Sequence, residues 1–565
     1  MRLSRRIAVK LLVYLCLCGT IAAQEFRRLP VGEYVDKMKA GWIGQMAGVG
    51  WGGPTEFRWE GKIIPVNGVP EWQPGMINQF GQDDLYVELT FLRTLEIHGL
   101  DCTIRQAGID FANSRYGLAE ANQAGRENLR RGIAPPDSGH PRFTRHSDDI
   151  DYQIESDYSG LIAPGMPRLT IELGEKFGRM MNYGDGLYAG QFVGGMYSEA
   201  FFEDDIVQII EAGLRCIPGE SQYAEMVRDM LAWYRENPDD WERTWQRCEE
   251  KYHKDAGYTH GLCSRPGGVN VHSIDAKLNG AYVLMGLLYG KGDPDRTIVI
   301  STRCGQDSDC NPSSAGGVLF TTIGFKKLPE RFVSSLNTKA KFAHSPYDFP
   351  QLCEVTEMLA RKAVVAQGGR IEKDDKGRDV FVIPVWPPKP GRLERSWEPG
   401  AVADSLFTDA EIARIAGGRS ARKEISKAVE TFAPGWQVAD CGGEMNPGLR
   451  EEWSGRKRVL VTHPLSEAVP CVLTKKVDVP EGKRSTLILG VGHDPHGDWT
   501  LAVKVNGKTL TEKKIGKGTC RDGWTEVAVD LSAYAGKSVK LELENRADGW
   551  SWEAGYWSRI VVGSE

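Results

Sequence analysis

Two acidic pairs lie far apart in this sequence of 565 residues, and each follows a glycine-led loop. Asp83 and Asp84 stand in FGQDDLYVELTF, and Asp307 and Asp309 stand in CGQDSDCNPSSAGG. An apolar run comes directly after each pair, so we expect the four carboxylates at the starts of two helices. Carboxylate oxygens are the ligands that Mg²⁺ and Ca²⁺ prefer. The spacing predicts a divalent-cation site, provided that the fold brings the two pairs together.

The helix after the first pair is predicted by its periodicity. Apolar residues recur at Leu85, Leu89, Leu92 and Leu95, at spacings of four, three and three, which places Asp83 and Asp84 in the first turn. One Asp at a helix start is explained by capping, which stabilises a helix by about 1 kcal/mol. A second adjacent Asp adds repulsion unless a cation or a donor offsets it. The pair therefore favours a ligand-binding role over capping alone.

A glycine- and proline-rich stretch follows the first helix that the sequence predicts, over residues 34–49. This stretch, GVGWGGPTEFRW, cannot continue a helix and contains Trp51, Glu56 and Trp59. Such loops beside active sites often close over substrate. Glu56 is our candidate for proton transfer, and the two tryptophans are candidates for stacking on a sugar or a base. A plain surface loop, with the tryptophans packed on the core, is the alternative.

The middle of the chain, from about residue 100 to 300, is helical in pattern, which predicts an all-α core. Two stretches in it, HSDDIDYQIESDYSG and NYGDGLYAG, are dense in Asp and Gly. We assign Asp149 and Asp185 from them as candidate substrate-binding residues. Helix capping is the alternative for each of these carboxylates.

The first 23 residues have the plan of a secretory signal peptide. MRLSRR is basic, LLVYLCLCGTIAA is apolar, and small residues stand near Ala22 and Ala23. An exported protein, periplasmic or secreted, is expected, with an uncleaved anchor as the alternative. No other stretch is apolar enough to cross a membrane, so no membrane association is expected after cleavage. The remaining cysteines are irregularly spaced, which leaves a few disulfides open and disfavours a zinc cage.

The composition changes after about residue 365. Residues 366–424 are charged and rich in proline, as in a linker or a wrapping segment. Residues 425–565 carry short alternating segments such as STLILGVG and SVKLELEN, with a predicted turn at Asn506-Gly507. This pattern predicts an all-β sandwich. It looks like the jelly-roll accessory domains of exported glycoside hydrolases, for which carbohydrate binding is an expectation.

The overall composition excludes one class of partner. Hydrophobic residues make up 41% and charged residues 26% of the chain, and the net charge is -6. There is no basic excess to hold a phosphate backbone. We expect no nucleic-acid partner.

The motifs in their order resemble the ADP-ribosylglycohydrolase family over roughly residues 32–365. GQMAGVGWGGPTE is similar to the opening segment of the family, QDDL to its first metal motif, and GQDSDC to its second. The resemblance implies a compact all-α domain with a two-magnesium centre and a catalytic glutamate. Carried over residue by residue, the matches are Gly44, Gly48, Gly52, Pro54 and Glu56, then Asp83 and Asp84, then Asp307 and Asp309.

The sequence departs from the family pattern at several positions. Gln82 and Leu85 replace threonines in the first metal motif, although the amide oxygen of Gln82 could still serve as a ligand. Cys310 replaces a threonine in the second and is a poor ligand for a hard cation. One or two Mg²⁺ ions are expected, with Ca²⁺ or Mn²⁺ as alternatives. The Asn-Gly and Met-Arg element of the family is replaced by ESDYSGLIAPGMPR, so the leaving group need not be ADP-ribose.

These observations predict an exported, metal-dependent glycohydrolase of the ADP-ribosylglycohydrolase type, which hydrolyses an N- or O-glycosidic bond. The substrate expected is an ADP-ribosylated or other glycosidic compound. One alternative is a glycoside hydrolase that acts on an extracellular carbohydrate, with a polysaccharide as partner. The other is a non-catalytic carbohydrate-binding protein on the same scaffold.

Overall fold

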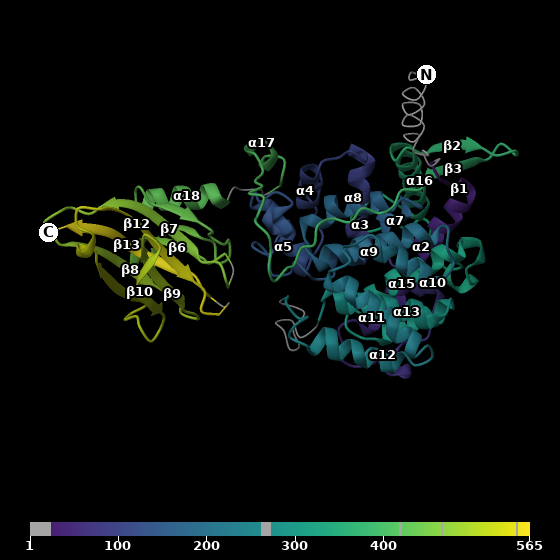
Figure 1. Ribbon diagram of the computed structural model, residues 1–565, viewed down its shortest axis with the longest axis horizontal. Helices are drawn as coiled ribbons and strands as arrows, with labels where there is room; N and C mark the ends of the chain where they lie inside the picture. The colour runs from purple at the N-terminus through teal and green to yellow at the C-terminus, as the bar shows by residue number, and fades with distance from the viewer. Residues whose placement is uncertain (1–23, 262–272, 417–420, 466, 550–551, 565) are drawn as a thin grey trace, which may run out of the picture.

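The computed structural model describes residues 24–261, 273–416, 421–465, 467–549 and 552–564. Figure 1 shows a helical body followed by a β-sandwich. The predicted signal peptide, residues 1–23, lies outside the described residues. Within the described part of the chain, no helix is both long enough and apolar enough to cross a bilayer.

The helix expected after the first acidic pair begins at Asp83 as predicted. The helices of the helical body are α2 (Val31–Gly52), α3 (Asp83–His98), α4 (Ile104–Ala112), α5 (Glu120–Arg130), α6 (Asp151–Ile154), α7 (Asp157–Leu161), α8 (Pro167–Phe177), α9 (Asp185–Ala200), α10 (Ile206–Leu214), α11 (Gln222–Glu236), α12 (Trp241–Cys248), α13 (Ala276–Gly290), α14 (Pro294–Arg303), α15 (Cys310–Ile323) and α16 (Phe349–Ala366). The prediction that the glycine-rich stretch cannot continue the first helix is wrong at its start, because α2 runs through Trp51 to Gly52 and ends only at the Gly53–Thr55 turn with Pro54.

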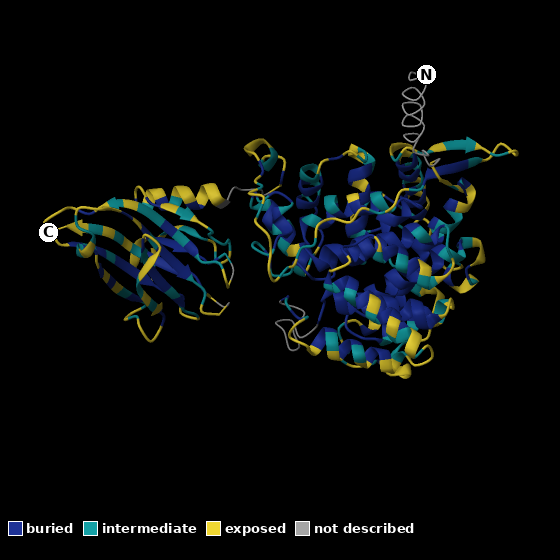
Figure 2. Ribbon diagram, in the orientation of Figure 1, coloured by how far each residue is buried: buried dark blue, intermediate teal, exposed yellow. Residues whose placement is uncertain are grey.

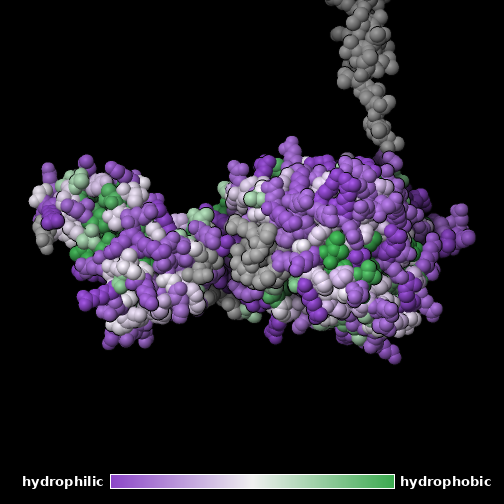
Figure 3. Space-filling model, turned by 90° about the horizontal axis from the view of Figure 1, so that it is seen from below, coloured by the Kyte–Doolittle hydropathy of each residue, from purple (hydrophilic) through white to green (hydrophobic). Residues whose placement is uncertain are grey.

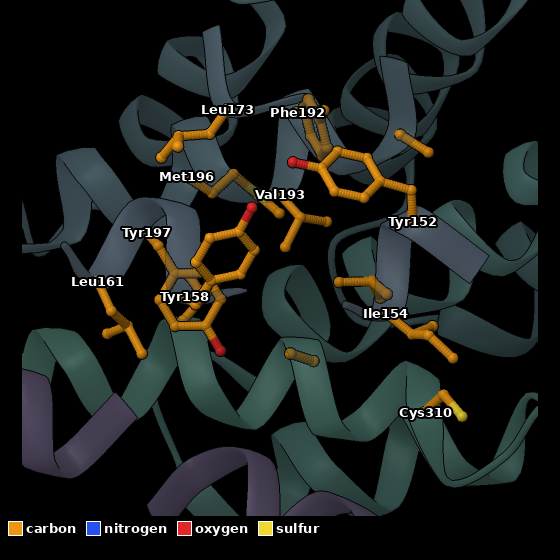
Figure 4. Packing of buried hydrophobic residues seen from close by; sticks show 14 of the residues in the cluster. Tyr152, Ile154, Tyr158, Leu161, Leu173, Phe192, Val193, Met196, Tyr197 and Cys310 are labelled. Carbon is orange, nitrogen blue, oxygen red and sulfur yellow. The ribbon is translucent and has the colours of Figure 1, made fainter. Parts of the chain in front are cut away.

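Four of these helices form the centre of the body. α2, α9, α13 and α15 are buried over most of their length, as Figure 2 shows by their dark colour. A helix that is buried on all sides must be apolar or small on all sides. Figure 4 shows part of this core around Tyr152, Tyr158 and Tyr197, with Cys310 at its edge.

Glycines let α2 and α15 approach one another. A Cβ atom on Gly44 would lie 2.4 Å from the carbonyl oxygen of Gly316, and one on Gly48 would lie 2.3 Å from that of Pro312. A Cβ atom on Gly52 would lie 2.0 Å from the carbonyl oxygen of Ser308. Real Cβ atoms do not come so close to backbone, so only glycine fits at these three positions. The glycines at four-residue spacing therefore hold the loop of the second acidic pair against the C-terminal end of α2.

A small antiparallel sheet lies at the edge of the helical body. Its order is β1 (Phe26–Pro30), β3 (Asp379–Pro384), β2 (Arg370–Lys373), so the chain start pairs with the region after α16. β2 and β3 fall in the segment 366–424, for which a linker or wrapping segment is predicted. The following residues run along the helical body, where Arg392 O accepts a hydrogen bond from Tyr188 Oη at 2.8 Å and Phe407 N donates to Gly132 O at 2.9 Å. The short helix α17 (Asp409–Ile412) ends this run.

The C-terminal body is the predicted sandwich. Two five-stranded antiparallel sheets have the orders β10-β9-β12-β7-β4 and β11-β8-β13-β6-β5. The predicted Asn506-Gly507 turn joins β9 to β10, with both residues at positive φ. The elements are α18 (Ala421–Phe432), β4 (Gln437–Ala439), β5 (Gly448–Trp453), β6 (Arg456–Thr462), β7 (Cys471–Asp478), β8 (Ser485–Gly492), β9 (Trp499–Val505), β10 (Lys508–Ile515), β11 (Trp524–Asp530), β12 (Ser538–Arg546) and β13 (Gly555–Ser564).

Alternation along these strands buries one face of each sheet, and Trp499 and Trp557 lie in the core between the sheets. On the face drawn in Figure 3, hydrophilic residues dominate both bodies, and each body carries small hydrophobic patches. Ion pairs join the two bodies: Arg142 pairs with Asp440, and Arg145 lies 3.2 Å from Glu467. All the described cysteines are free thiols.

Candidate functional site: a carboxylate centre

The structure brings the two acidic pairs together. Ligand atoms of Asp83, Asp84 and Cys310 lie within 4.8 Å of one another, and so do those of Asp307, Asp309 and Cys310. Cys310 belongs to both groups. It is the first residue of α15 and directly follows the second pair. The first turn of α3 thus faces the first turn of α15.

Helix capping does not account for these acids. Gln82 is the N-cap of α3 and Asp309 the N-cap of α15, and neither side chain accepts a capping hydrogen bond. Both carboxylate oxygens of the buried Asp84 and Oδ1 of the buried Asp307 lack a hydrogen-bond partner in the described chain. Buried charged oxygens without partners are costly unless a cation or a proton satisfies them.

The acids also raise one another's pKa. Burial, then the neighbouring Asp83 and Asp309, raise the pKa of Asp84 well above its usual value. Burial and Asp309 do the same to the pKa of Asp307, and burial raises the pKa of Asp309 to about 6. The neighbours that raise these values are themselves carboxylates. Such a group holds protons when it is empty and releases them when a cation binds.

Glu56 reaches the same centre from α2. It follows the 3₁₀ turn Gly53–Thr55 that ends this helix. Thr55 Oγ1 lies 2.8 Å from Ser308 Oγ, and Phe57 N donates to Gln306 O at 3.1 Å, which fixes the segment against the second acidic loop. The Glu56 side chain opens to solvent, and its partial burial, followed by Asp309 and Asp83, raises its pKa to about 8.

One buried acid near the centre was missed by sequence reasoning. Glu155 is fully buried, and burial, then Asp151, raises its pKa well above the usual value, with Asp83 and Asp84 as further causes. Asn122 Nδ2 donates to its Oε1, whereas Oε2 has no partner in the described chain. Its signal was its place in ESDYSG, the stretch that replaces the Asn-Gly element, but nothing local showed where that stretch lies.

The other predicted site residues lie in varied surroundings. Trp51 is 6% exposed, donates from Nε1 to Pro70 O at 2.8 Å and packs on Trp72. Trp59 is half-buried, and its carbonyl accepts from Gln306 N at 3.2 Å, beside the second acidic loop. Asp185 is buried, and its Oδ1 accepts from Tyr223 N at 3.0 Å, which ties α9 to α11. Asp149 lies in a separate cluster with His146 and Glu120.

The residues present fit a divalent cation. The unpartnered oxygens of Asp84 and Asp307 supply the hard donors that Mg²⁺ and Ca²⁺ require. The thiol of Cys310 lies 3.8 Å from Asp309 Oδ1, and burial raises its pKa, so it stays protonated without a metal. A thiol is a soft donor, which suits Zn²⁺ better than Mg²⁺, so the four carboxylates remain the ligands for a hard cation.

Comparisons with known proteins agree with the helical body. The family described as ADP-ribosylglycohydrolase matches residues 31–367. A solved structure titled "ADP-ribosylglycohydrolase-related protein complex" is 14% identical, with a TM-score of 0.37, and the match covers 59% of this chain and 99% of that chain. A search of the curated proteins finds no match.

Two further structures match the C-terminal body. One is the CBM22-1 xylan-binding domain of Xyn10C from Paenibacillus barcinonensis, at 16% identity, with a TM-score of 0.18 over 24% of this chain and 87% of that chain. The other is a family 35 carbohydrate binding module from Clostridium thermocellum, at 12% identity, with a TM-score of 0.17 over 23% of this chain and 92% of that chain. The family match over the helical body is the stronger finding, and by it the chain belongs to the ADP-ribosylglycohydrolase family.

Proposed function

We propose that the helical body hydrolyses an N- or O-glycosidic bond and that this activity depends on a divalent cation. One observation carries the proposal. Carboxylates from three separate segments meet at the ends of α2, α3 and α15, and buried oxygens of Asp84 and Asp307 have no partner in the described chain. Mg²⁺ is the first candidate, as one or two ions, and Ca²⁺ and Mn²⁺ are the alternatives.

In this proposal Asp83, Asp84, Asp307 and Asp309 hold the cation, and Gln82 stands beside them at the N-cap of α3. When bound, the cation polarises substrate hydroxyls and lowers the pKa of a bound water. Glu56 holds the proton that is exchanged with the reacting group, since it is the acid of the centre that opens to solvent from α2. The substrate-binding roles of Trp51, Trp59, Asp149 and Asp185 stay predictions.

Family membership and the departures from the family pattern favour different classes of substrate. Family membership favours an ADP-ribosylated compound. A second candidate is a neutral extracellular glycoside, because ESDYSGLIAPGMPR, which contains Glu155, replaces the Asn-Gly and Met-Arg element of the family. The third candidate, a non-catalytic binder of carbohydrate, rests on Val49, where the family's opening segment has an Asp, and on Leu85 and Cys310, where its metal motifs have threonines.

The proposal also includes the placement and build of the chain. The basic and apolar start supports export to the periplasm or the medium, with residues 1–23 removed. The helical catalytic domain would span residues 32–365, the wrapping segment 366–424 and the sandwich 425–565. We propose that the sandwich is a jelly-roll accessory domain that binds carbohydrate, and no nucleic acid or membrane enters this scheme.

The test is a metal-supplemented hydrolysis screen on the mature chain. ADP-ribosyl compounds, nucleosides and oligosaccharides are incubated with the protein in Mg²⁺, Mn²⁺ or Ca²⁺, and the released sugar is identified. We expect metal-dependent release that Asp307→Asn lowers at least 100-fold, whereas Asp101→Asn, at an exposed site, has no effect. Equal release by Asp307→Asn, or release that chelation does not change, would overturn the proposal. The product separates the two enzymatic candidates.

A further inference from the structure

A second cluster of ligating side chains lies away from the carboxylate centre. Glu120, at the first position of α5, meets His146 and Asp149, which precede α6, and their ligand atoms lie within 4.8 Å of one another. Glu120 and His146 line a cavity of about 340 Å³. Glu444 and Leu465 of the sandwich line the same cavity, so it lies where the two bodies meet.

The geometry places two carboxylates on one ring nitrogen. His146 Nδ1 lies 2.7 Å from Asp149 Oδ2 and 3.0 Å from Glu120 Oε2. A single Nδ1–H proton makes one good hydrogen bond, so two acids at these distances compete for it. A cation in place of the proton would satisfy both acids at once.

A second observation points to a ligand independently. The Asp149 side chain is 0% exposed, and its other oxygen, Oδ1, has no hydrogen-bond partner in the described chain. An unpartnered carboxylate oxygen in a fully buried position costs more than almost any other polar group. This oxygen belongs to the carboxylate that already contacts His146, so it borders the space between the three side chains.

The nearby charges do not remove the excess of acid. Asp151 is a further acid near Glu120 and His146. Its Oδ1 accepts a hydrogen bond from Asn122 N at 2.8 Å. Arg145 is held by Glu467 at 3.2 Å, and Arg131 by Glu127 at 3.6 Å. Glu444 of the sandwich, which also lines the cavity, is another acid.

We propose that Glu120, His146 and Asp149 bind a divalent transition-metal cation of the Zn²⁺ class. One imidazole and two carboxylates are the donor set that such ions take, with a position left open toward the cavity. This site differs from the carboxylate centre, whose carboxylates favour Mg²⁺. An ion here would lie at the junction of the helical body and the sandwich, whose Glu444 lines the same cavity.

The test measures bound zinc on the full mature chain. Protein is dialysed against buffered Zn²⁺ with excess Mg²⁺ to occupy the first centre, and the zinc retained per chain is determined by mass spectrometry. Asp307→Asn weakens the first centre, so zinc that this variant loses when His146→Ala is added reports the second site. We expect Asp307→Asn to retain one equivalent, and the double variant with His146→Ala to retain none.

A matched pair separates a built site from charge alone. Glu120→Gln is expected to weaken zinc binding at least tenfold, whereas Glu127→Gln, on the same helix and lining the same cavity, leaves it unchanged. Melting curves recorded in chelator show whether each variant folds. If His146→Ala does not fold, Glu120→Gln replaces it in the double variant with Asp307→Asn. Retention of zinc by both His146→Ala and Glu120→Gln, or equal losses in Glu120→Gln and Glu127→Gln, would mean an adventitious ion only and overturn the proposal.

Discussion

Each acid of the carboxylate centre has a distinct setting. Asp84 and Asp307 are buried with unpartnered oxygens, which suits metal ligation, whereas Glu56 opens to solvent and carries a raised pKa, which suits proton transfer. Cys310 lies in reach of both acidic pairs. The types of residue at the centre therefore divide the work between holding an ion and moving a proton.

The division of roles gives a prediction at Glu56. Glu56→Gln keeps the size and polarity of the side chain but cannot exchange a proton, so kcat/KM is expected to fall by about 100-fold or more. The rise in melting temperature on addition of Mg²⁺ should persist, because the metal ligands are intact. Glu71→Gln, an exposed loop change, is the control. A variant that loses the Mg²⁺ response together with activity would instead make Glu56 a metal ligand.

At the scale of elements, the contact of α2 with α15 decides whether the centre forms. Gly48→Ala would place a Cβ atom 2.3 Å from the backbone of Pro312, so the two helices must move apart. We expect a loss of about 1–3 kcal/mol in the free energy of unfolding and weaker metal binding. Chemical denaturation with and without Mg²⁺ measures both.

The control for this change lies on the same helix. Gly32→Ala adds a Cβ atom with nothing within 4 Å, and Ala is the better helix former by about 1 kcal/mol. It should leave metal binding unchanged and stability equal or higher. Similar losses in both variants would mean that glycine freedom, and not close approach, matters at Gly48.

The sandwich carries a pair of thiols at its edge. Cys441 follows β4 and Cys471 begins β7, and the nearby Cys441 thiol, after burial, raises the pKa of Cys471. Oxidised glutathione should join them: the two thiols pass two electrons and two protons to one glutathione disulfide, which becomes two glutathione thiols. We expect two fewer alkylatable thiols and a higher melting temperature, because a cross-link of this loop length stabilises by about 3 kcal/mol.

Cys441→Ser should abolish both effects, whereas Cys520→Ser, a half-buried thiol in the same body, should abolish neither. Oxidation that proceeds equally in Cys441→Ser would mean that other cysteines react. The pair matters if the chain is exported, since oxidising compartments preserve such bonds.

For the whole molecule, the carboxylate centre without a bound cation makes the free energy of unfolding depend on pH. Its acids have pKa values above those of the unfolded chain, with Asp309 at about 6, Glu56 at about 8 and Asp84 raised well above its usual value. The folded state then binds more protons than the unfolded state from about pH 4 upward. The stability that these protons supply is complete below the unfolded pKa and is lost as pH rises through the folded pKa values.

In chelator, the melting temperature is therefore expected to fall from pH 5.5 to pH 8. Mg²⁺ should reverse this trend, because it binds the ionised acids and gives the larger stabilisation at the higher pH. Differential scanning calorimetry at four pH values, with and without Mg²⁺, measures the effect. A melting temperature in chelator that rises across this range would contradict the assignment of raised pKa values.

The sequence by itself determined much of the build. Periodicity placed α3 and the strands of the sandwich, because the repeat of apolar residues directly encodes which side of an element is buried. The ordered motifs also indicated the family. The glycines at positions 44, 48 and 52 belong to these motifs because α2 approaches α15 too closely there for any side chain. The pattern of residues 366–424 predicts a linker or wrapping segment and does not show β2 and β3, because short strands that pair with a distant segment leave a weak local signal.

Only the tertiary structure decided which side chains meet. Nothing in the sequence around Glu155 shows that it lies near Asp84, nor that His146 lies between Glu120 and Asp149, because these contacts join turns from separate helices. Trp51 shows the same limit, since it packs on Trp72 and Phe332 in the core. Local pattern fixes the elements, whereas the distances between carboxylates follow from how closely the helices pack, and that is a property of the whole fold.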